Sequence, residues 1–89
     1  MGARLRTEDL TWQDLEGEVV VLDLRSSTYF LVNGSGARLW ELLADAAADT
    51  SVPELAAELR AVYALPDDVA IAHVEEFLQS LERSGLLVP

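Results

Sequence analysis

The stretch from Val19 to Gly36 constrains the fold more than any other part of the sequence. Two runs rich in β-branched and aromatic residues, 19–24 and 28–32, flank the short polar segment 25–27. So short a connection between two such runs is typical of an antiparallel hairpin. Asn33-Gly34-Ser35-Gly36 then offers positive-φ positions and two candidate N-caps, and apolar residues with helical spacing follow. We therefore expect a hairpin, a sharp turn and the start of a helix as one unit.

A further strand is expected before this hairpin. Residues 11–15 alternate imperfectly between apolar and polar side chains, and Glu16-Gly17 separates them from the run 18–23. A glycine-containing turn between two such runs predicts a first hairpin. The sequence thus predicts a three-stranded antiparallel meander over 11–15, 18–23 and 28–32. Residues 4–9 show no clear period, so we expect a loose lead-in there that pairs at most at its end, and we assign it no function.

The third strand, Thr28–Val32, carries no charged residue and no proline. Period-2 alternation places Phe30 and Val32 on one face and Tyr29 and Leu31 on the other. Edge strands normally carry charges, proline or a bulge that prevent unwanted pairing. Two alternatives follow: a helix or another strand covers this strand, or its edge is left open for a partner.

Three helices are expected after the meander. The first covers about 35–46, and the small residues of 46–50 either continue it or form a linker. The second begins at Ser51, because Ser51 and Glu54 have the spacing of a capping box and Pro53 stands in the first turn. It ends near residue 64. Its expected inward stripe consists of Leu55, Leu59, Val62 and Tyr63.

The third helix begins after Pro66, where two aspartates favour a helix N-terminus, and runs to about Ser84 with Gly85 as its C-cap. The segment 86–88 is expected to pack as an apolar tail. Three strands followed by three helices predict an α+β fold of the winged helix-turn-helix type. The expected stripe of the third helix consists of Val69 or Ala70, Val74, Phe77, Leu78 and Leu81.

Composition limits the classes of function. A chain of 89 residues, 51% of them hydrophobic, predicts one folded domain over 1–89 with a modest core and no deep cleft. The absence of cysteine excludes thiol chemistry and disulfides and agrees with a reducing cytoplasm. No apolar signal core or membrane-spanning run is present, so we expect a cytoplasmic protein that is independent of membranes.

The net charge of −10, with six basic residues that are all arginine, argues against nucleic acid as a partner. In a winged helix-turn-helix protein the third helix would enter the major groove of DNA. Here that helix carries five acidic residues and would be repelled by phosphate. An acidic surface suits a basic or neutral peptide or protein better. The five acidic residues are Asp67, Asp68, Glu75, Glu76 and Glu82, against Arg83 and His73.

Residues for catalysis or metal binding are scarce. His73 is the only imidazole, and a Ser-His-Asp arrangement would require Asp23 or another acid and a loop serine beside it. His73 and Glu76 have i, i+3 spacing, but a single strong ligand is a poor metal site. The segment 33–36 has the outline of a phosphate cradle, yet it lacks the lysine of a P-loop, so a capped turn explains it better. We expect no cofactor, and we expect Trp12 and Trp40 to anchor the core.

Several segments recur in an order that is known from one family: Val21-Leu22-Asp23-Leu24-Arg25, Tyr29-Phe30, Asn33, Gly36-Ala37-Arg38-Leu39-Trp40-Glu41-Leu42-Leu43, Leu55-Ala56-Ala57-Glu58-Leu59, Val74-Glu75-Glu76-Phe77-Leu78 and Gly85-Leu86-Leu87. In sequence and order they resemble the PqqD-like family, although the family tends to have a small residue followed by Leu where this chain has Leu31-Val32. The resemblance implies a recognition element that binds the leader segment of a ribosomally made precursor peptide, with free-standing forms in lasso-peptide biosynthesis.

In that family the leader adds as a strand beside the third strand and its side chains enter a groove against the third helix. The resemblance therefore implies that main-chain pairing comes from Thr28, Tyr29, Phe30, Leu31 and Val32. It implies a groove wall made of Val69, Ala70, His73, Val74 and Phe77. Lasso leaders often carry a Tyr-x-x-Pro element, so aromatic and prolyl pockets are expected there, and an acidic rim would steer a basic leader.

The resemblance also implies partners beyond the leader: a leader peptidase and a macrolactam cyclase of the same pathway. A PqqD-type chaperone that serves a radical-SAM maturase is an alternative that the sequence does not separate from this one. A DNA-binding winged helix is disfavoured by charge, and a small hydrolase is disfavoured by the residues available. We expect a peptide-binding protein that is not an enzyme.

Overall fold

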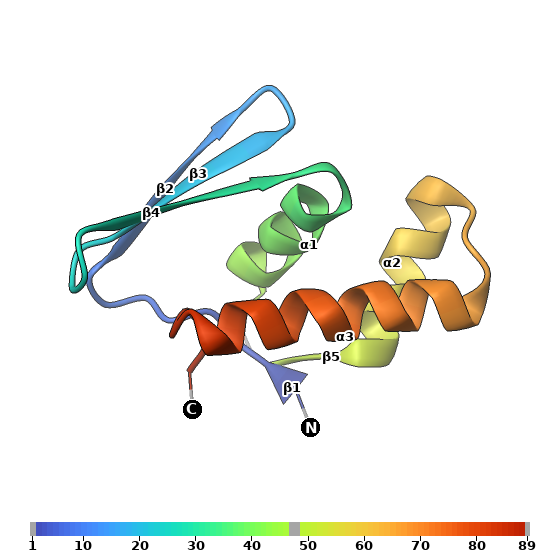
Figure 1. Ribbon diagram of the computed structural model, residues 1–89. Helices are drawn as coiled ribbons and strands as arrows, with labels where there is room; N and C mark the ends of the chain where they lie inside the picture. The colour runs from blue at the N-terminus through green and yellow to red at the C-terminus, as the bar shows by residue number, and fades with distance from the viewer. Residues whose placement is uncertain (1, 47–48, 89) are drawn as a thin grey trace.

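A three-stranded sheet and three helices form the body of the fold, in the order that the sequence predicts (Figure 1). The computed structural model describes residues 2–46 and 49–88. The predicted α+β class, the antiparallel meander and the three helices are confirmed. The elements are β1 (Gly2–Ala3), β2 (Leu10–Leu15), β3 (Glu18–Asp23), β4 (Thr28–Asn33), α1 (Gly34–Asp45), β5 (Thr50–Ser51), α2 (Val52–Tyr63) and α3 (Asp67–Arg83).

The strands of the sheet lie in the order β2-β3-β4, with antiparallel pairing throughout. Phe30 and Val32 of β4 lie opposite Val21 and Val19 of β3, and these two valines are fully buried. Phe30 and Val32 are half-buried, whereas Tyr29 is 71% exposed and Leu31 is 63% exposed. The predicted assignment of these four side chains of β4 to two faces is confirmed.

β4 is an edge strand, because it pairs with β3 alone within the described residues. The turn between β2 and β3, Glu16-Gly17, has φ values of 49° and 87°, as in a type I′ turn. In a hairpin with this turn, the two residues that flank the turn form a hydrogen-bonded pair. The backbone N–H and C=O groups of Glu18 therefore face β2, and those of every second residue along β3 do the same. The backbone N–H and C=O groups of Val19 and Val21 therefore face β4. On β4, Tyr29 and Leu31 consequently direct their N–H and C=O groups to the free edge.

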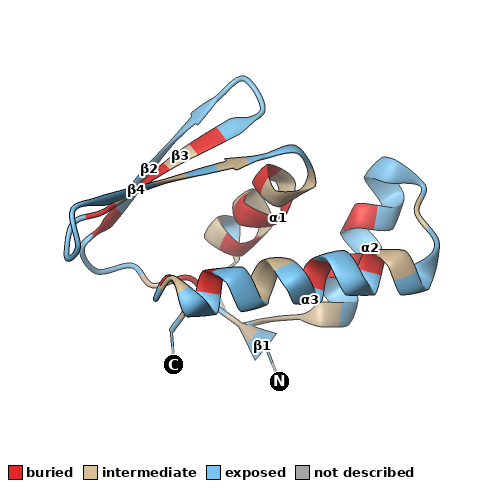
Figure 2. Ribbon diagram, in the orientation of Figure 1, coloured by how far each residue is buried: buried red, intermediate tan, exposed pale blue. Residues whose placement is uncertain are grey.

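α1 packs across the inner face of the sheet, and α2 and α3 pack against each other beside it (Figure 1). The buried residues gather where these elements meet (Figure 2). The capping box at Ser51 is confirmed. The C-cap of α3 is Ser84, one residue before the predicted Gly85, which takes the positive φ of 74° that ends the helix. Asn33 is the N-cap of α1, but its side chain makes no capping hydrogen bond.

No helix in the described part of the chain is both long and apolar enough to cross a membrane.

Two predictions about buried side chains are wrong. Val62 and Tyr63 were expected in the inward stripe of α2, but they lie near its C-terminal end, beyond the contact with the core, and are exposed. Trp12 was expected to anchor the core, but it lies on the edge strand β2 and is 38% exposed. Its ring meets Trp40 in a T-shaped contact with a centroid distance of 5.5 Å. Trp40, in contrast, is fully buried as predicted.

The N-terminal segment is integrated into the fold, so the prediction of a loose lead-in is wrong. Leu5 is buried and forms a bridge with Leu87, next to the buried Leu86 of the predicted apolar tail. β1 pairs with β5, which occupies part of the segment expected as a helix continuation or linker. Residues 47–48 of that segment lie outside the described residues. These pairings join segments that are far apart in the chain, so patterns within a few residues of sequence do not predict them.

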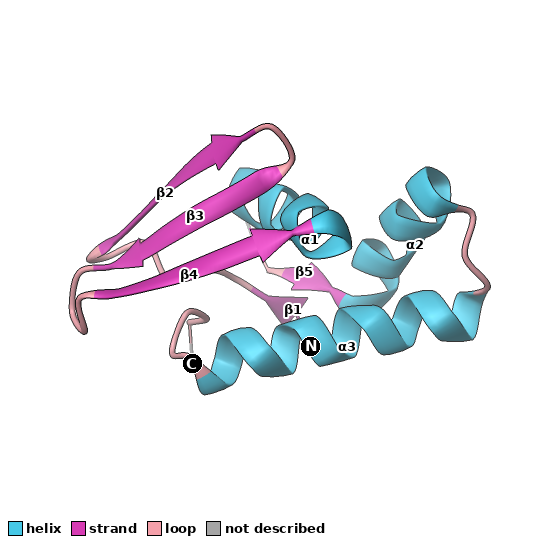
Figure 3. Ribbon diagram, turned by 45° about the horizontal axis from the view of Figure 1, so that its top comes forward, coloured by secondary structure: helices cyan, strands magenta, loops and turns pink. Residues whose placement is uncertain are grey.

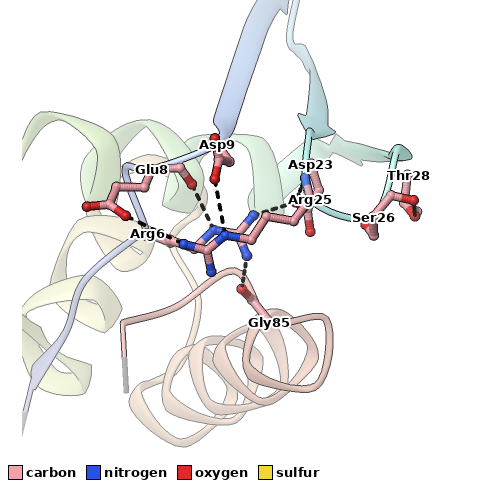
Figure 4. Close-up of polar contacts among 8 residues, drawn as sticks. All are labelled: Arg6, Glu8, Asp9, Asp23, Arg25, Ser26, Thr28 and Gly85. Atoms are coloured by element: carbon pink, nitrogen blue, oxygen red, sulfur yellow. Dashed lines mark hydrogen bonds and ion pairs between the residues drawn. The ribbon is translucent and has the colours of Figure 1, made fainter.

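A polar cluster ties the N-terminal segment to the sheet and to the end of α3 (Figure 4). The guanidinium of Arg6 donates to Oδ1 of Asp23 at 2.5 Å and to the carbonyl of Gly85 at 2.9 Å. The backbone N–H of Arg25 donates to the same Asp23 oxygen at 3.0 Å. Arg6 therefore links the end of β3 to the turn that follows α3.

Asp23 is the buried charged residue of the core region. Burial by itself would raise the pKa of the Asp23 carboxyl. Hydrogen bonds from Arg6, from the N–H of Arg25 and from Ser26, together with the positive charge of Arg6, outweigh this effect, so the pKa of Asp23 is lowered. The carboxylate is thus held in its charged form by the residues around it.

The substitution Asp23→Asn tests this cluster. A carboxyl whose pKa falls on folding adds stability above its unfolded pKa of about 4, and this contribution is lost as the pH falls through the folded value. We expect the variant to have a lower free energy of unfolding at neutral pH and a flatter decline between about pH 5 and about pH 2. Urea denaturation measures both, with Asp9→Asn at an exposed ion pair as the control. Equal pH slopes for parent and Asp23→Asn would contradict the assignment.

Candidate functional site

The candidate site lies between the free edge of β4 and α3, with the first turn of α1 between them (Figure 3). The chain passes directly from β4 into α1, so this strand and the start of the helix are positioned as one unit. The predicted positive φ is present at Gly34, where it is 57°. This turn redirects the chain from the sheet edge into the helix.

Gly36 brings α1 close to both neighbours. A Cβ atom at this position would lie 3.1 Å from Cγ1 of Val32 and 3.3 Å from Cε1 of Phe77. Both distances are shorter than ordinary van der Waals contacts, so a side chain here would require the side chains of Val32 and Phe77 to shift by a few tenths of an ångström. The absence of a side chain at residue 36 therefore sets the separation between the strand and the helix.

A groove with a volume of about 310 Å³ opens beside this contact. Phe77 and Leu39 supply apolar surface, and His73 and Glu76 supply polar groups. A shallow groove with mixed polarity suits the side chains of an extended peptide and does not enclose a small molecule. Its lining residues are Ser35, Gly36 and Leu39 of α1 and His73, Glu76, Phe77 and Ser80 of α3.

The structure brings some of the predicted site residues to this surface and moves others away from it. His73 and Phe77 line the groove, and Val69 is half-buried one turn before His73. Ala70 and Val74 are fully buried in the core, so they support α3 from beneath and do not line the groove. The apolar residues of α3 include some that pack in the core and some that line the groove, and the sequence alone did not distinguish the two sets. The predicted strand residues Thr28, Tyr29, Phe30, Leu31 and Val32 all lie on β4.

Sequence reasoning missed five lining residues: Ser35, Gly36, Leu39, Glu76 and Ser80. On α3 a signal was present, because positions 73, 76, 77 and 80 follow the i, i+3, i+4, i+7 spacing of one helix face. On α1 no signal separated residues that touch the groove from those that cap or pack. The contribution of α1 became visible only with the packing of its first turn against α3.

The site offers little for chemical catalysis. Asp23, the acid considered for a catalytic triad, accepts hydrogen bonds from Arg6 and Arg25 at the opposite end of β4 from the groove. In the part of the chain that the structure describes, no group of three potential metal ligands is found. What the arrangement offers is a strand edge that is unpaired within the described residues and a nearby groove of mixed polarity.

Comparisons with known proteins agree with this geometry. The sequence model of the family described as "Coenzyme PQQ synthesis protein D (PqqD)" matches residues 18–87, from the start of β3 to the C-terminal tail. The chain belongs to the PqqD family. The segments that carried the resemblance therefore lie in a domain shared with this family, and β2 precedes the matched region. No curated protein matches the sequence.

Two solved structures resemble this PqqD-family chain over its length. One, described as "TbiB1 in Complex with the TbiA(beta) Leader Peptide", has a TM-score of 0.84 and 25% sequence identity and covers 94% of this chain and 93% of its own. The other, described as "Lasso peptide synthetase B1 complexed with the leader peptide", has a TM-score of 0.83 and 25% identity and covers 100% of both chains. Both of these neighbours are described as complexes with a leader peptide.

The substitution Gly36→Val tests the close approach in this PqqD-family domain. The added side chain must displace Val32 or Phe77, and overpacking of this kind costs about 1–3 kcal/mol of unfolding free energy. Urea denaturation measures the loss. The control is Ser35→Val, which introduces the same side chain in the same helical turn at a half-buried position. A Gly36→Val variant as stable as Ser35→Val would show that residue 36 does not set the spacing.

Proposed function

We propose that this domain binds the leader segment of a ribosomally synthesised precursor peptide. The leader adds as a fourth strand along β4, and its side chains enter the groove against α3. The observation that carries the proposal is the open edge of β4, which runs directly into the turn of α1 that lines this groove. The two structural neighbours, both complexes with a leader peptide, support it.

The proposed contacts divide between backbone and side chains. Thr28 to Val32 supply main-chain pairing, with the outward groups of Tyr29 and Leu31 as its principal donors and acceptors. Val69, His73 and Phe77 form the wall on α3, together with the lining residues from the start of α1. Ala70 and Val74 contribute by holding α3 in place from within the core.

The affinity must come from both kinds of contact. Each main-chain hydrogen bond contributes about 0.5–1.5 kcal/mol net, whereas association costs at least about 4 kcal/mol in lost freedom of motion. A few bonds therefore leave little net affinity. Two or three buried side chains at about 2 kcal/mol each would bring the dissociation constant to roughly micromolar or better. An aromatic or prolyl leader residue fits the apolar part of the groove.

The bound leader is then presented to maturation enzymes, and the domain itself performs no chemistry. Within lasso-peptide biosynthesis the corresponding partners are a leader peptidase and a macrolactam cyclase in the cytoplasm. A PqqD-type chaperone for a radical-SAM maturase is the alternative, and it is supported by the description of the matching family. In both cases residues 1–89 act as a single recognition domain.

A winged helix-turn-helix protein that binds DNA is the weaker candidate. The order of α2 and α3 after a β-meander agrees with that architecture. However, α3 begins with Asp67 and Asp68 and carries Glu75 on its exposed surface. With a net charge of −10, phosphate would be repelled from this helix.

The substitution Leu31→Pro tests strand addition. Proline removes the outward N–H of residue 31 and no bond to β3, so the sheet is retained while the edge loses a donor. We expect calorimetry to show leader affinity at least tenfold weaker, which corresponds to about 1.4 kcal/mol. Leu31→Thr keeps the N–H and the strand propensity and serves as the control. If circular dichroism shows Leu31→Pro folded and its affinity equals that of Leu31→Thr, the leader does not pair with β4.

The substitution Ser80→Trp tests the groove. An indole at this exposed position on the groove wall would occupy the space proposed for a leader side chain. We expect leader affinity to fall at least tenfold, or about 1.4 kcal/mol, with little change in stability. Gln79→Trp adds the same side chain at the next exposed position of α3, outside the groove lining, and should retain affinity. Equal affinities for the two variants would place the leader side chains elsewhere.

A further inference from the structure

A second cavity, of about 350 Å³, opens between β2 and α1. It shares no lining residue with the groove beside α3. β2 and β4 are the two outer strands of the sheet, so this cavity belongs to the edge away from the proposed leader path. Its lining residues are Trp12, Asp14, Val19, Trp40, Glu41, Ala44 and Asp45.

The cavity contains both tryptophans of the chain. Trp12 is 38% exposed and presents its indole to solvent at the sheet edge. Trp40 is fully buried behind it, and its Nε1 has no hydrogen-bond partner among the described residues. A partly exposed tryptophan that rests on a buried one is a fixed aromatic surface, because the T-shaped contact between the rings restrains it.

Three carboxylates line the same cavity: Asp14 from β2, and Glu41 and Asp45 from α1. Asp14 and Glu41 line the cavity together, and a hydrogen bond to Asp14 and the negative charge of that residue raise the pKa of the Glu41 carboxyl. Arg38 is the cation nearby, 3.8 Å from Glu41, and it also lies 3.7 Å from Glu58. One guanidinium is thus shared between two acids, and the cavity retains negative charge.

The chemistry of this cavity favours an organic cation over a metal ion. In residues 2–46 and 49–88 no three acidic or histidine side chains lie close enough to hold a metal. An arginine guanidinium needs no such convergence, because its flat face stacks on an indole while its N–H groups reach separate carboxylates. Lysine offers a point charge without this planar match.

We propose that this cavity binds an arginine side chain of a second protein that docks at the β2 edge. The charge complementarity between a guanidinium and the pair Asp14 and Glu41 carries the proposal, with Trp12 as the stacking surface. Because the cavity and the leader groove are separate, the domain can hold both molecules at once. That the second protein acts on the bound leader rests on the proposed function; the arginine site itself does not.

The emission of the two tryptophans provides a direct test, because all tryptophan fluorescence of the chain originates in this cavity. The probe is N-acetyl-arginine amide, and the control ligand is N-acetyl-citrulline amide, which has nearly the same shape without the charge. We expect a saturable change in emission with the arginine probe and at least tenfold weaker binding of the citrulline compound. Equal binding of both ligands, or no saturable change, would overturn the proposal.

Variants separate the cavity from the general negative charge of the protein. Asp14→Asn combined with Glu41→Gln should weaken arginine binding at least tenfold and should stay folded, since Asp14 is exposed, Glu41 is half-buried and both amides keep the size and hydrogen-bonding capacity of the acids. Glu75→Gln combined with Glu82→Gln removes the same charge from exposed positions of α3 that do not line the cavity, and should change binding less than twofold. If the two double variants lose the same amount of arginine affinity, the binding depends only on the net charge of the protein and the proposed site is wrong.

Leader binding is measured on the same proteins. The Asp14→Asn and Glu41→Gln variant should bind leader with the parent affinity, because its substitutions lie outside the groove. Arginine binding without leader binding in the parent protein would refute the proposed function and retain the arginine site. Leader binding without arginine binding would refute the arginine site alone.

Discussion

The ion pair between Arg6 and Asp23 is the contact on which the arrangement of sheet and helix depends. It joins the N-terminal segment to the end of β3, and the same guanidinium bonds the carbonyl of Gly85 after α3. This side chain therefore links the sheet to the C-terminal end of α3, beside the backbone hydrogen bonds that join residues 4 and 6 to residues 88 and 86. This explains why Asp23 is buried and charged: its neighbours supply enough hydrogen bonds to offset the loss of water.

Gly36 acts at the other end of the same interface. There the spacing between β4 and α3 is set by close contact, because the helix start touches Val32 and Phe77 without a side chain between them. A polar clamp at one end and a tight apolar contact at the other fix the strand and the helix relative to each other. A peptide that adds to β4 would then meet a preformed groove and pay little to order it.

The two edges of the sheet differ in character. The edge of β4 is apolar and adjoins the groove, which suits an extended peptide. The edge of β2 carries Trp12 and Asp14 above the acidic side of α1, which suits a basic group. Under the two proposals, a peptide at the edge of β4 and a protein at the edge of β2 would occupy different edges of one small domain.

The sequence by itself determined the elements whose signals are local. The hairpin, the two faces of β4 and the capping box at Ser51 follow from alternation, turn residues and spacing within a few positions, and the structure confirms each. The uncharged third strand follows from local pattern as well, whereas His73 and Phe77 were named as groove residues only by the resemblance to the PqqD-like family.

Only the tertiary structure decided which side of each element faces the groove. Ala70 and Val74 share the apolar stripe of α3 with Phe77, yet they point into the core, because the helix is covered by α2 on one side and by the start of α1 on another. Likewise Leu5 has the same local signal as an exposed leucine, and its burial arises from pairing with Leu87 at the far end of the chain. Contacts between distant segments leave no periodic trace in the sequence, so burial of this kind is fixed by packing alone.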